Sequence, residues 1–218
     1  MSVANQTIIN FAALESATVY QEPFPFLIIP DFLRRETAVQ VAKDFPKIDL
    51  AGSVPVNALE CGPFFRRFIE ELEGDALRYA IGKKFDIDLE NRPTIITVRG
   101  RTRAKDGRIH TDTKTKLISL LLYFNLEWEF DAGRLRILRD SENLENYVAE
   151  IPPTLGQCLI FKVTDNCWHG HKPFEGERRA IQLNYLTNKA ALTHHLSMHS
   201  LSARWKSWKR WFSRGDEY

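Results

Sequence analysis

Gly107-Arg-Ile-His110-Thr-Asp112 combines a histidine and a carboxylate two positions apart, and a further histidine, His169, follows well downstream. Residues i and i+2 of an extended segment point to the same side, so the imidazole and the carboxylate can face one point. With His169 from a second strand they would form a set of three ligands that suits a divalent metal and leaves positions on the ion open. The alternative is a buried His–Asp hydrogen bond and an unrelated histidine.

This pattern resembles the Fe(II)/2-oxoglutarate-dependent dioxygenases, specifically their prolyl-4-hydroxylase-like branch. In the family, His-x-Asp is followed after a long gap by His and, about ten residues later, by Arg or Lys, which the chain matches at His110, Asp112, His169 and Arg178. Three more segments resemble the family in the same order: the apolar strand at 117–125, the turn Ala132-Gly133-Arg-Leu135 in place of Gly-Gly-x-Leu, and the strand at 152–161. The resemblance covers roughly residues 24–187.

The resemblance implies a non-haem iron enzyme that hydroxylates an unactivated C–H bond with 2-oxoglutarate and O2 as co-substrates. Fe(II) would be held by His110, Asp112 and His169. Arg178 would hold the distal carboxylate of 2-oxoglutarate, because its planar guanidinium can donate two hydrogen bonds to a carboxylate. Tyr123 would touch the same carboxylate, or it is an ordinary strand aromatic. Halogenation is disfavoured because Asp112 supplies the carboxylate that halogenases lack.

Two neighbouring residues compete for these roles. His171 would point to the same side as His169, but position 180, nine residues beyond it, is Ala. His171 is therefore expected near the substrate or at the rim of the site. Arg179 competes with Arg178, and only one of the two can enter the barrel because adjacent strand residues face opposite sides. The family's inward series of small residues favours Arg178.

The expected fold is mainly β with flanking α-helices. Residues 1–22 are predicted to form an N-terminal tail, and 23–187 the dioxygenase domain, with helical support at 31–84 and a β core at 93–187. Asp31 is a candidate N-cap for a helix to about residue 45, and Gly74 would divide a second helical region at 63–84. Strands are predicted at 24–30, 94–100, 117–125, 134–138, 157–163, 168–174 and 178–186. The pattern leaves a sandwich or a barrel open; the resemblance implies a double-stranded β-helix, or jelly roll.

Composition sets broad limits on the class of protein. The 218 residues suit one domain, and 44% hydrophobic and 27% charged residues are ordinary globular values. A net charge of +2 gives no sign of nucleic-acid binding. Three cysteines without paired spacing suit a reducing compartment. Because neither a signal peptide nor a transmembrane segment is visible, we expect a cytoplasmic protein, free or peripheral to the inner face of the membrane.

The C-terminal tail, 188–218, has a different composition. An apolar stripe at helical spacing with basic neighbours predicts an amphipathic helix over 201–212; the stripe comprises Leu201, Trp205, Trp208 and Phe212. Such a helix would contact a membrane surface, a partner or a second copy, or pack on its own domain.

The substrate is less constrained by the sequence. Arginines surround the expected mouth of the site, and they form either a solvated face or a site for an anionic substrate such as a phosphorylated or lipid-linked acidic sugar; they are Arg99, Arg101, Arg103, Arg108, Arg134 and Arg136. The candidate substrate contacts are Arg101, Arg136, Trp128 and His171, and residues 101–108 could form a lid. We expect a hydroxylase of a small metabolite or glycoconjugate; the alternatives are a peptidyl-prolyl hydroxylase and a catalytically silent jelly-roll binding protein.

Overall fold

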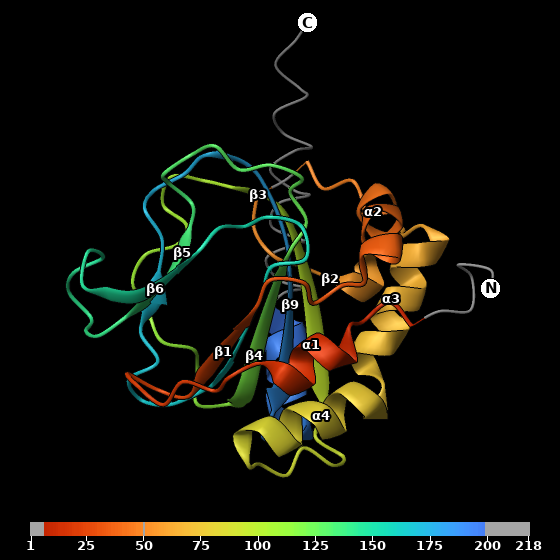
Figure 1. The fold of residues 1–218 in the computed structure, drawn as a ribbon, viewed down its shortest axis with the longest axis horizontal. Coiled ribbons are helices and arrows are strands. Elements are labelled where there is room, and N and C mark those ends of the chain that lie inside the picture. Colours follow the sequence, from red (N-terminus) through yellow and green to blue (C-terminus); the bar gives the residue numbers. More distant parts are fainter. Residues whose placement is uncertain (1–6, 50, 199–218) are drawn as a thin grey trace, which may run out of the picture.

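Two antiparallel sheets form the body of the protein, and helices pack on one side of the larger sheet (Figure 1). The computed structural model describes residues 7–49 and 51–198. The six-stranded sheet has the order β1 (Phe26–Ile29), β7 (Cys158–Lys162), β4 (Lys116–Tyr123), β9 (Gly176–Leu186), β3 (Thr94–Thr102) and β2 (Val54–Pro55). The three-stranded sheet has the order β6 (Tyr147–Ile151), β5 (Leu135–Leu138) and β8 (His169–Gly170). The mainly β, jelly-roll fold predicted from the sequence is confirmed.

The larger sheet has two different faces because successive side chains of a strand point to opposite sides. In β4, Ile118, Leu120 and Leu122 belong to the core beneath the helices, whereas Leu121 and Tyr123 belong to a second core between the sheets. The helices on the first face are α1 (Phe11–Ser16), α2 (Arg35–Lys43), α3 (Pro63–Glu73) and α4 (Asp75–Phe85). The face toward the smaller sheet is therefore the inner one.

The amphipathic helix α3 shows why the helices cover the outer face. Its buried residues Phe65, Phe68, Ile69 and Leu72 recur at helical spacing. Gly74 ends α3 and directly precedes α4, so the predicted division of this helical region is confirmed.

Several boundaries differ from those expected. Ile8, Ile9 and Leu14 are fully buried, so this part of residues 1–22 belongs to the folded body rather than to a tail. Asp31 does not cap α2, which begins after Arg34, because the buried Leu33 is held extended in a bridge to Ile9. The strand predicted at 168–174 is short, spanning only His169–Gly170, and β6 was not predicted.

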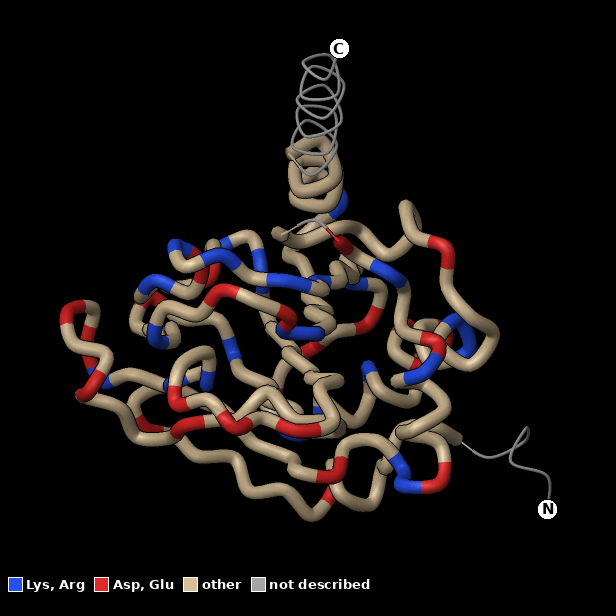
Figure 2. The backbone as a smooth tube through the Cα atoms, turned by 90° about the horizontal axis from the view of Figure 1, so that it is seen from above, with Lys and Arg blue, Asp and Glu red and all other residues tan. Residues whose placement is uncertain are grey.

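Charged positions of both signs are interspersed along the described chain (Figure 2). The predicted amphipathic helix at 201–212 lies outside the described residues. Within residues 7–49 and 51–198, no helix combines the length and apolar character that crossing a membrane would require.

Candidate metal centre

His110, Asp112 and His169 converge at the open end of the inner face. His110 and His169 lie opposite each other in an antiparallel bridge, and each backbone N–H donates to the other's carbonyl at 3.0 Å. This pairing places the two imidazole rings 4.3 Å apart between centroids. One possible ligand atom from each of His110, Asp112 and His169 lies within 4.8 Å of the other two.

Backbone carbonyls orient both imidazoles. Nδ1 of His110 lies 2.7 Å from the Arg108 carbonyl, and Nδ1 of His169 lies 2.8 Å from the Cys167 carbonyl. A carbonyl only accepts hydrogen bonds, so each Nδ1 carries a proton, and in the neutral ring Nε2 is then the nitrogen that can bind a metal. Such a second hydrogen bond is the usual device by which proteins fix the tautomer of a metal-binding histidine.

The carboxylate of Asp112 is held at both oxygens. Lys116 Nζ donates to Oδ1 at 2.7 Å, and the Ser119 hydroxyl donates to Oδ2. Burial alone would raise the pKa of Asp112, but the Lys116 ammonium and the hydrogen bonds from Lys116 and Ser119 outweigh it and lower the pKa. Asp112 is thus ionised at neutral pH.

The pKa of His169 is lowered as well, which favours the neutral form of this residue. Burial, followed by the neighbouring His110, lowers its pKa to about 4. A neutral imidazole and an ionised carboxylate are the forms that bind a divalent metal, and a set with two nitrogens and one oxygen suits Fe(II). The residues therefore fit the metal that the sequence implied.

Arg178 reaches the same cavity from β9. Its Nε donates to the Gly133 carbonyl at 2.8 Å, its Nη2 lies 3.3 Å from the Tyr123 hydroxyl, and its guanidinium lies 4.9 Å from the centre of the Tyr123 ring. Arg179 faces outward, where its guanidinium lies 5.8 Å from the Phe45 ring and its Nε 2.7 Å from Glu177. The alternation of β9 thus separates the two arginines.

The cavity between these groups has a volume of about 130 Å³. Its lining includes the three candidate ligands, Arg99, His171 and Arg178. The His171 ring packs against Gly107, where a Cβ would lie 2.1 Å from Nε2. Burial, and next the charge of Arg178, lowers the pKa of His171 to about 4, so this residue offers a neutral imidazole to the cavity.

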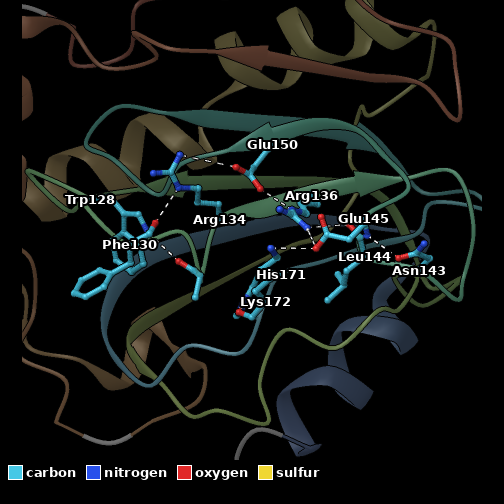
Figure 3. Close-up of polar contacts among 11 residues, drawn as sticks. Trp128, Phe130, Arg134, Arg136, Asn143, Leu144, Glu145, Glu150, His171 and Lys172 are labelled. Carbon is cyan, nitrogen blue, oxygen red and sulfur yellow. Dashed lines mark hydrogen bonds and ion pairs between the residues drawn. The ribbon is translucent and has the colours of Figure 1, made fainter.

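Arg136 differs from the expected substrate contact because it points away from the cavity. Its strand neighbours Leu135 and Ile137 face the inner core, and its guanidinium lies on the other side of β5. There its Nε lies 2.6 Å from Glu150 and its Nη1 2.9 Å from Glu145 (Figure 3). The expectation that Arg136 contacts the substrate is therefore wrong. Side chains alternate along β5, and the two ion pairs hold the guanidinium on the side away from the cavity.

Trp128 and Arg101 also lie outside the cavity lining. Trp128 packs against Phe130 and Phe174, and its Nε1 donates to the Ala132 carbonyl at 3.0 Å. Arg101 is exposed and pairs in register with the outward-facing Glu177. Neither of these two expected substrate contacts lines the cavity, and their contact with the substrate stays a prediction.

Arg99 lines the cavity, although the sequence did not mark it as a candidate substrate contact. Residues 99 and 101 would share a face in a regular strand, but the β3–β9 register shifts between them, so Arg99 pairs with the inward Ala180. The glycine between the two arginines was the one sequence sign of this bulge.

Comparison with known proteins agrees with this geometry. Residues 100–186 match the family described as the 2OG-Fe(II) oxygenase superfamily. The resemblance to this superfamily that the sequence indicated is thus confirmed over residues 100–186. Fe(II), 2-oxoglutarate and O2 are thus its metal and co-substrates, and the predicted enzyme class, a 2-oxoglutarate-dependent dioxygenase, is confirmed. No curated protein sequence matches the chain.

Solved structures share the fold of this oxygenase at low sequence identity. A prolyl-4-hydroxylase from Pseudomonas putida has a TM-score of 0.54 and 16% identity, over 75% of this chain and 92% of that one. A prolyl 4-hydroxylase from Phytophthora capsici has a TM-score of 0.52 and 15% identity, over 85% and 68%. The viral collagen prolyl hydroxylase from Paramecium Bursaria Chlorella virus-1 has a TM-score of 0.51 and 16% identity, over 74% and 96%.

Proposed function

We propose that this oxygenase binds Fe(II) through His110, Asp112 and His169 and hydroxylates a C–H bond of a small metabolite or glycoconjugate. The observation that carries the proposal is the convergence of three ligand atoms within 4.8 Å in a cavity that also contains the buried Arg178. Bound Fe(II) would supply the activation of O2, coupled to the decarboxylation of 2-oxoglutarate to succinate and CO2.

The protein's own residues would position the reactants. Nε2 of His110, Nε2 of His169 and one oxygen of Asp112 would hold the metal. Arg178 would hold the distal carboxylate of 2-oxoglutarate, with Tyr123 fixing the guanidinium beside it. Leu121, Leu135 and Ala180 line the same cavity and would exclude water from the reacting groups.

Succinate formation tests this proposal without knowledge of the substrate. The purified protein is mixed with Fe(II), ascorbate and 2-oxoglutarate in air, and succinate is measured alongside 2-oxoglutarate binding by calorimetry. We expect uncoupled succinate formation that His110→Ala and Asp112→Ala abolish, whereas His194→Ala, at an exposed histidine, retains it. Binding of 2-oxoglutarate without turnover would indicate an enzyme that requires its substrate. Neither binding nor turnover would favour the silent jelly-roll protein.

A prolyl peptide is the second candidate substrate. It is favoured by the fold similarity to proteins described as prolyl hydroxylases. Stimulation of succinate formation by a proline-rich peptide, but not by sugars or sugar phosphates, would select this candidate over the small-molecule substrate.

A further inference from the structure

Arg99 is a second arginine of the cavity, in addition to Arg178. Arg99 on β3 pairs with Ala180 on β9, and Ala180 in turn pairs with Tyr123 on β4. All three residues therefore lie in one row on the inner face of the larger sheet. The side chain of Arg99 is 29% exposed, whereas Arg178 as a residue is 4% exposed. Arg178 is therefore enclosed within the cavity, whereas Arg99 is partly open to solvent.

The two arginines have different partners. Arg99 Nη2 donates to the Ser53 hydroxyl at 3.1 Å, and Nη1 lies 3.6 Å from an oxygen of Asp106. Asp106 lies nearer to Arg103, at 2.9 Å. Burial lowers the pKa of Arg99, and the charges of Arg178 and Arg103 add to this effect, while Asp106 opposes it. Arg99 thus shares the Asp106 carboxylate with Arg103, and it also lies in the electrostatic field of a third arginine, Arg178.

The charge of the cavity is positive before and after its expected ligands bind. Asp112 is neutralised by Lys116, and Asp106 is shared between two arginines. In the described part of the chain, no carboxylate lies within 4.0 Å of the Arg178 guanidinium. Fe(II) and 2-oxoglutarate carry equal and opposite charges, so their binding leaves the net positive charge of the cavity unchanged. A further anion is the ligand that such a field attracts.

We infer that Arg99 binds an anionic group of the substrate, a carboxylate or a phosphate, and holds it at the mouth of the cavity. This inference rests on the proposed function and names the class of its substrate. The anion would replace Asp106 as the principal partner of Arg99, while Asp106 keeps its closer contact with Arg103. A guanidinium can donate two parallel hydrogen bonds to either group.

Paramagnetic relaxation tests this inference directly. Mn(II) replaces Fe(II), so that the protein binds 2-oxoglutarate without turnover and relaxes nuclei held near the metal. With 2-oxoglutarate saturating, the probes are methyl phosphate, followed by ³¹P relaxation, and acetate, followed by ¹³C relaxation. Trimethyl phosphate is the neutral control. We expect faster relaxation of at least one of the two anions but not of trimethyl phosphate, and the anion affected distinguishes phosphate from carboxylate.

The variants assign the effect to Arg99. Arg99→Gln should reduce the relaxation enhancement about tenfold, as expected for lost hydrogen bonds to a charged group. Arg99→Lys should restore part of it, which a merely structural role would not do. Arg101→Gln is the matched control, because it removes the same charge from the outer side of the same strand. The 2-oxoglutarate affinity should fall less in Arg99→Gln than in Arg178→Gln.

Three results would overturn the inference: equal enhancement in the wild type and Arg99→Gln, no enhancement above that of trimethyl phosphate, or a loss of 2-oxoglutarate affinity in Arg99→Gln as large as in Arg178→Gln. The last result would make Arg99 a co-substrate residue. Failure of the wild type to bind Mn(II) or 2-oxoglutarate would instead remove the proposed function, and this inference with it.

Discussion

The guanidinium of Arg178 is fixed by the Gly133 carbonyl and by Tyr123 before any ligand arrives. Such preorganisation lowers the entropy cost of binding a carboxylate. We expect Arg178→Ala to raise the KM for 2-oxoglutarate about 10- to 100-fold, since hydrogen bonds to a charged group are lost. Metal content, measured by elemental analysis, should stay the same because Arg178 is not a ligand. Unchanged turnover at low 2-oxoglutarate would contradict this assignment.

Lys116 offers a second test at the scale of one residue. Its ion pair with Asp112 is nearly buried, with side-chain exposures of 12% and 7%. Lys116→Met would leave a buried carboxylate unpaired and should destabilise the metal-free protein by about 3 kcal/mol. Because a bound cation would then replace the lost ammonium, the stabilisation by Mn(II) in thermal melts should become larger than in the wild type.

Lys114→Met is the matched control for Lys116→Met. Lys114 pairs with Asp165 at 2.8 Å, but both side chains are about four-fifths exposed, at 84% and 80%. Exposed pairs contribute little to stability. An equal loss of stability in both variants, or no greater Mn(II) effect in Lys116→Met, would show that the Lys116–Asp112 pair does not tune the metal site.

The loop between β3 and His110 is the element that closes the cavity beside His171. Gly107 has φ +79, a backbone conformation that favours glycine. Its carbonyl accepts from the His171 N–H at 2.8 Å, and a Cβ there would overlap the His171 ring. The loop can therefore approach β8 only with glycine at this position.

Gly107→Ala should weaken Mn(II) binding about tenfold, because the displaced loop leads directly into His110. The free energy of unfolding should fall by roughly 2 kcal/mol. Gly156→Ala is the control: Gly156 has a similar φ of +84, but its Cβ would approach only the Pro30 carbonyl, at 3.4 Å. It should lose about 1 kcal/mol and retain metal affinity. Similar metal affinities in both variants would argue against the role of this loop.

For the whole molecule, two buried neutral histidines make stability depend on pH. The pKa values of His169 and His171 fall from 6.5 to about 4 on folding. Below pH 6.5 the unfolded chain binds protons that the folded protein does not, so acid destabilises the fold until the pH reaches the folded values. The stability is therefore present above pH 6.5 and is lost as the pH falls toward 4.

We expect the free energy of unfolding of the metal-free protein to fall by about 2 kcal/mol per histidine between pH 7 and pH 5. Urea denaturation at a series of pH values measures this change. His194→Ala, at an exposed position, should show the same pH dependence as the wild type. A stability that stays constant between pH 7 and 5 would mean that neither histidine is held neutral by the fold.

Features that depend on local periodicity could be read from the sequence. The alternation of β4 and β9 placed Tyr123 and Arg178 on one face and Arg179 on the other, because the side-chain period of a strand is two. The order of the motifs indicated the jelly roll and the superfamily, and Gly74 marked the break between α3 and α4. The metal ligands remain a proposal, although the structure brings all three together.

Features that depend on register and on contacts between distant segments were decided only by the tertiary structure. The shift between Arg99 and Arg101 exchanges which arginine faces the cavity, and it arises from pairing with β9 rather than from the sequence of β3 alone. The ion pairs that turn Arg136 outward likewise come from another strand and its loop. The sequence of a short polar strand shows which of its side chains share a face. Only the pairing with its partner strand decides which of the two faces is buried.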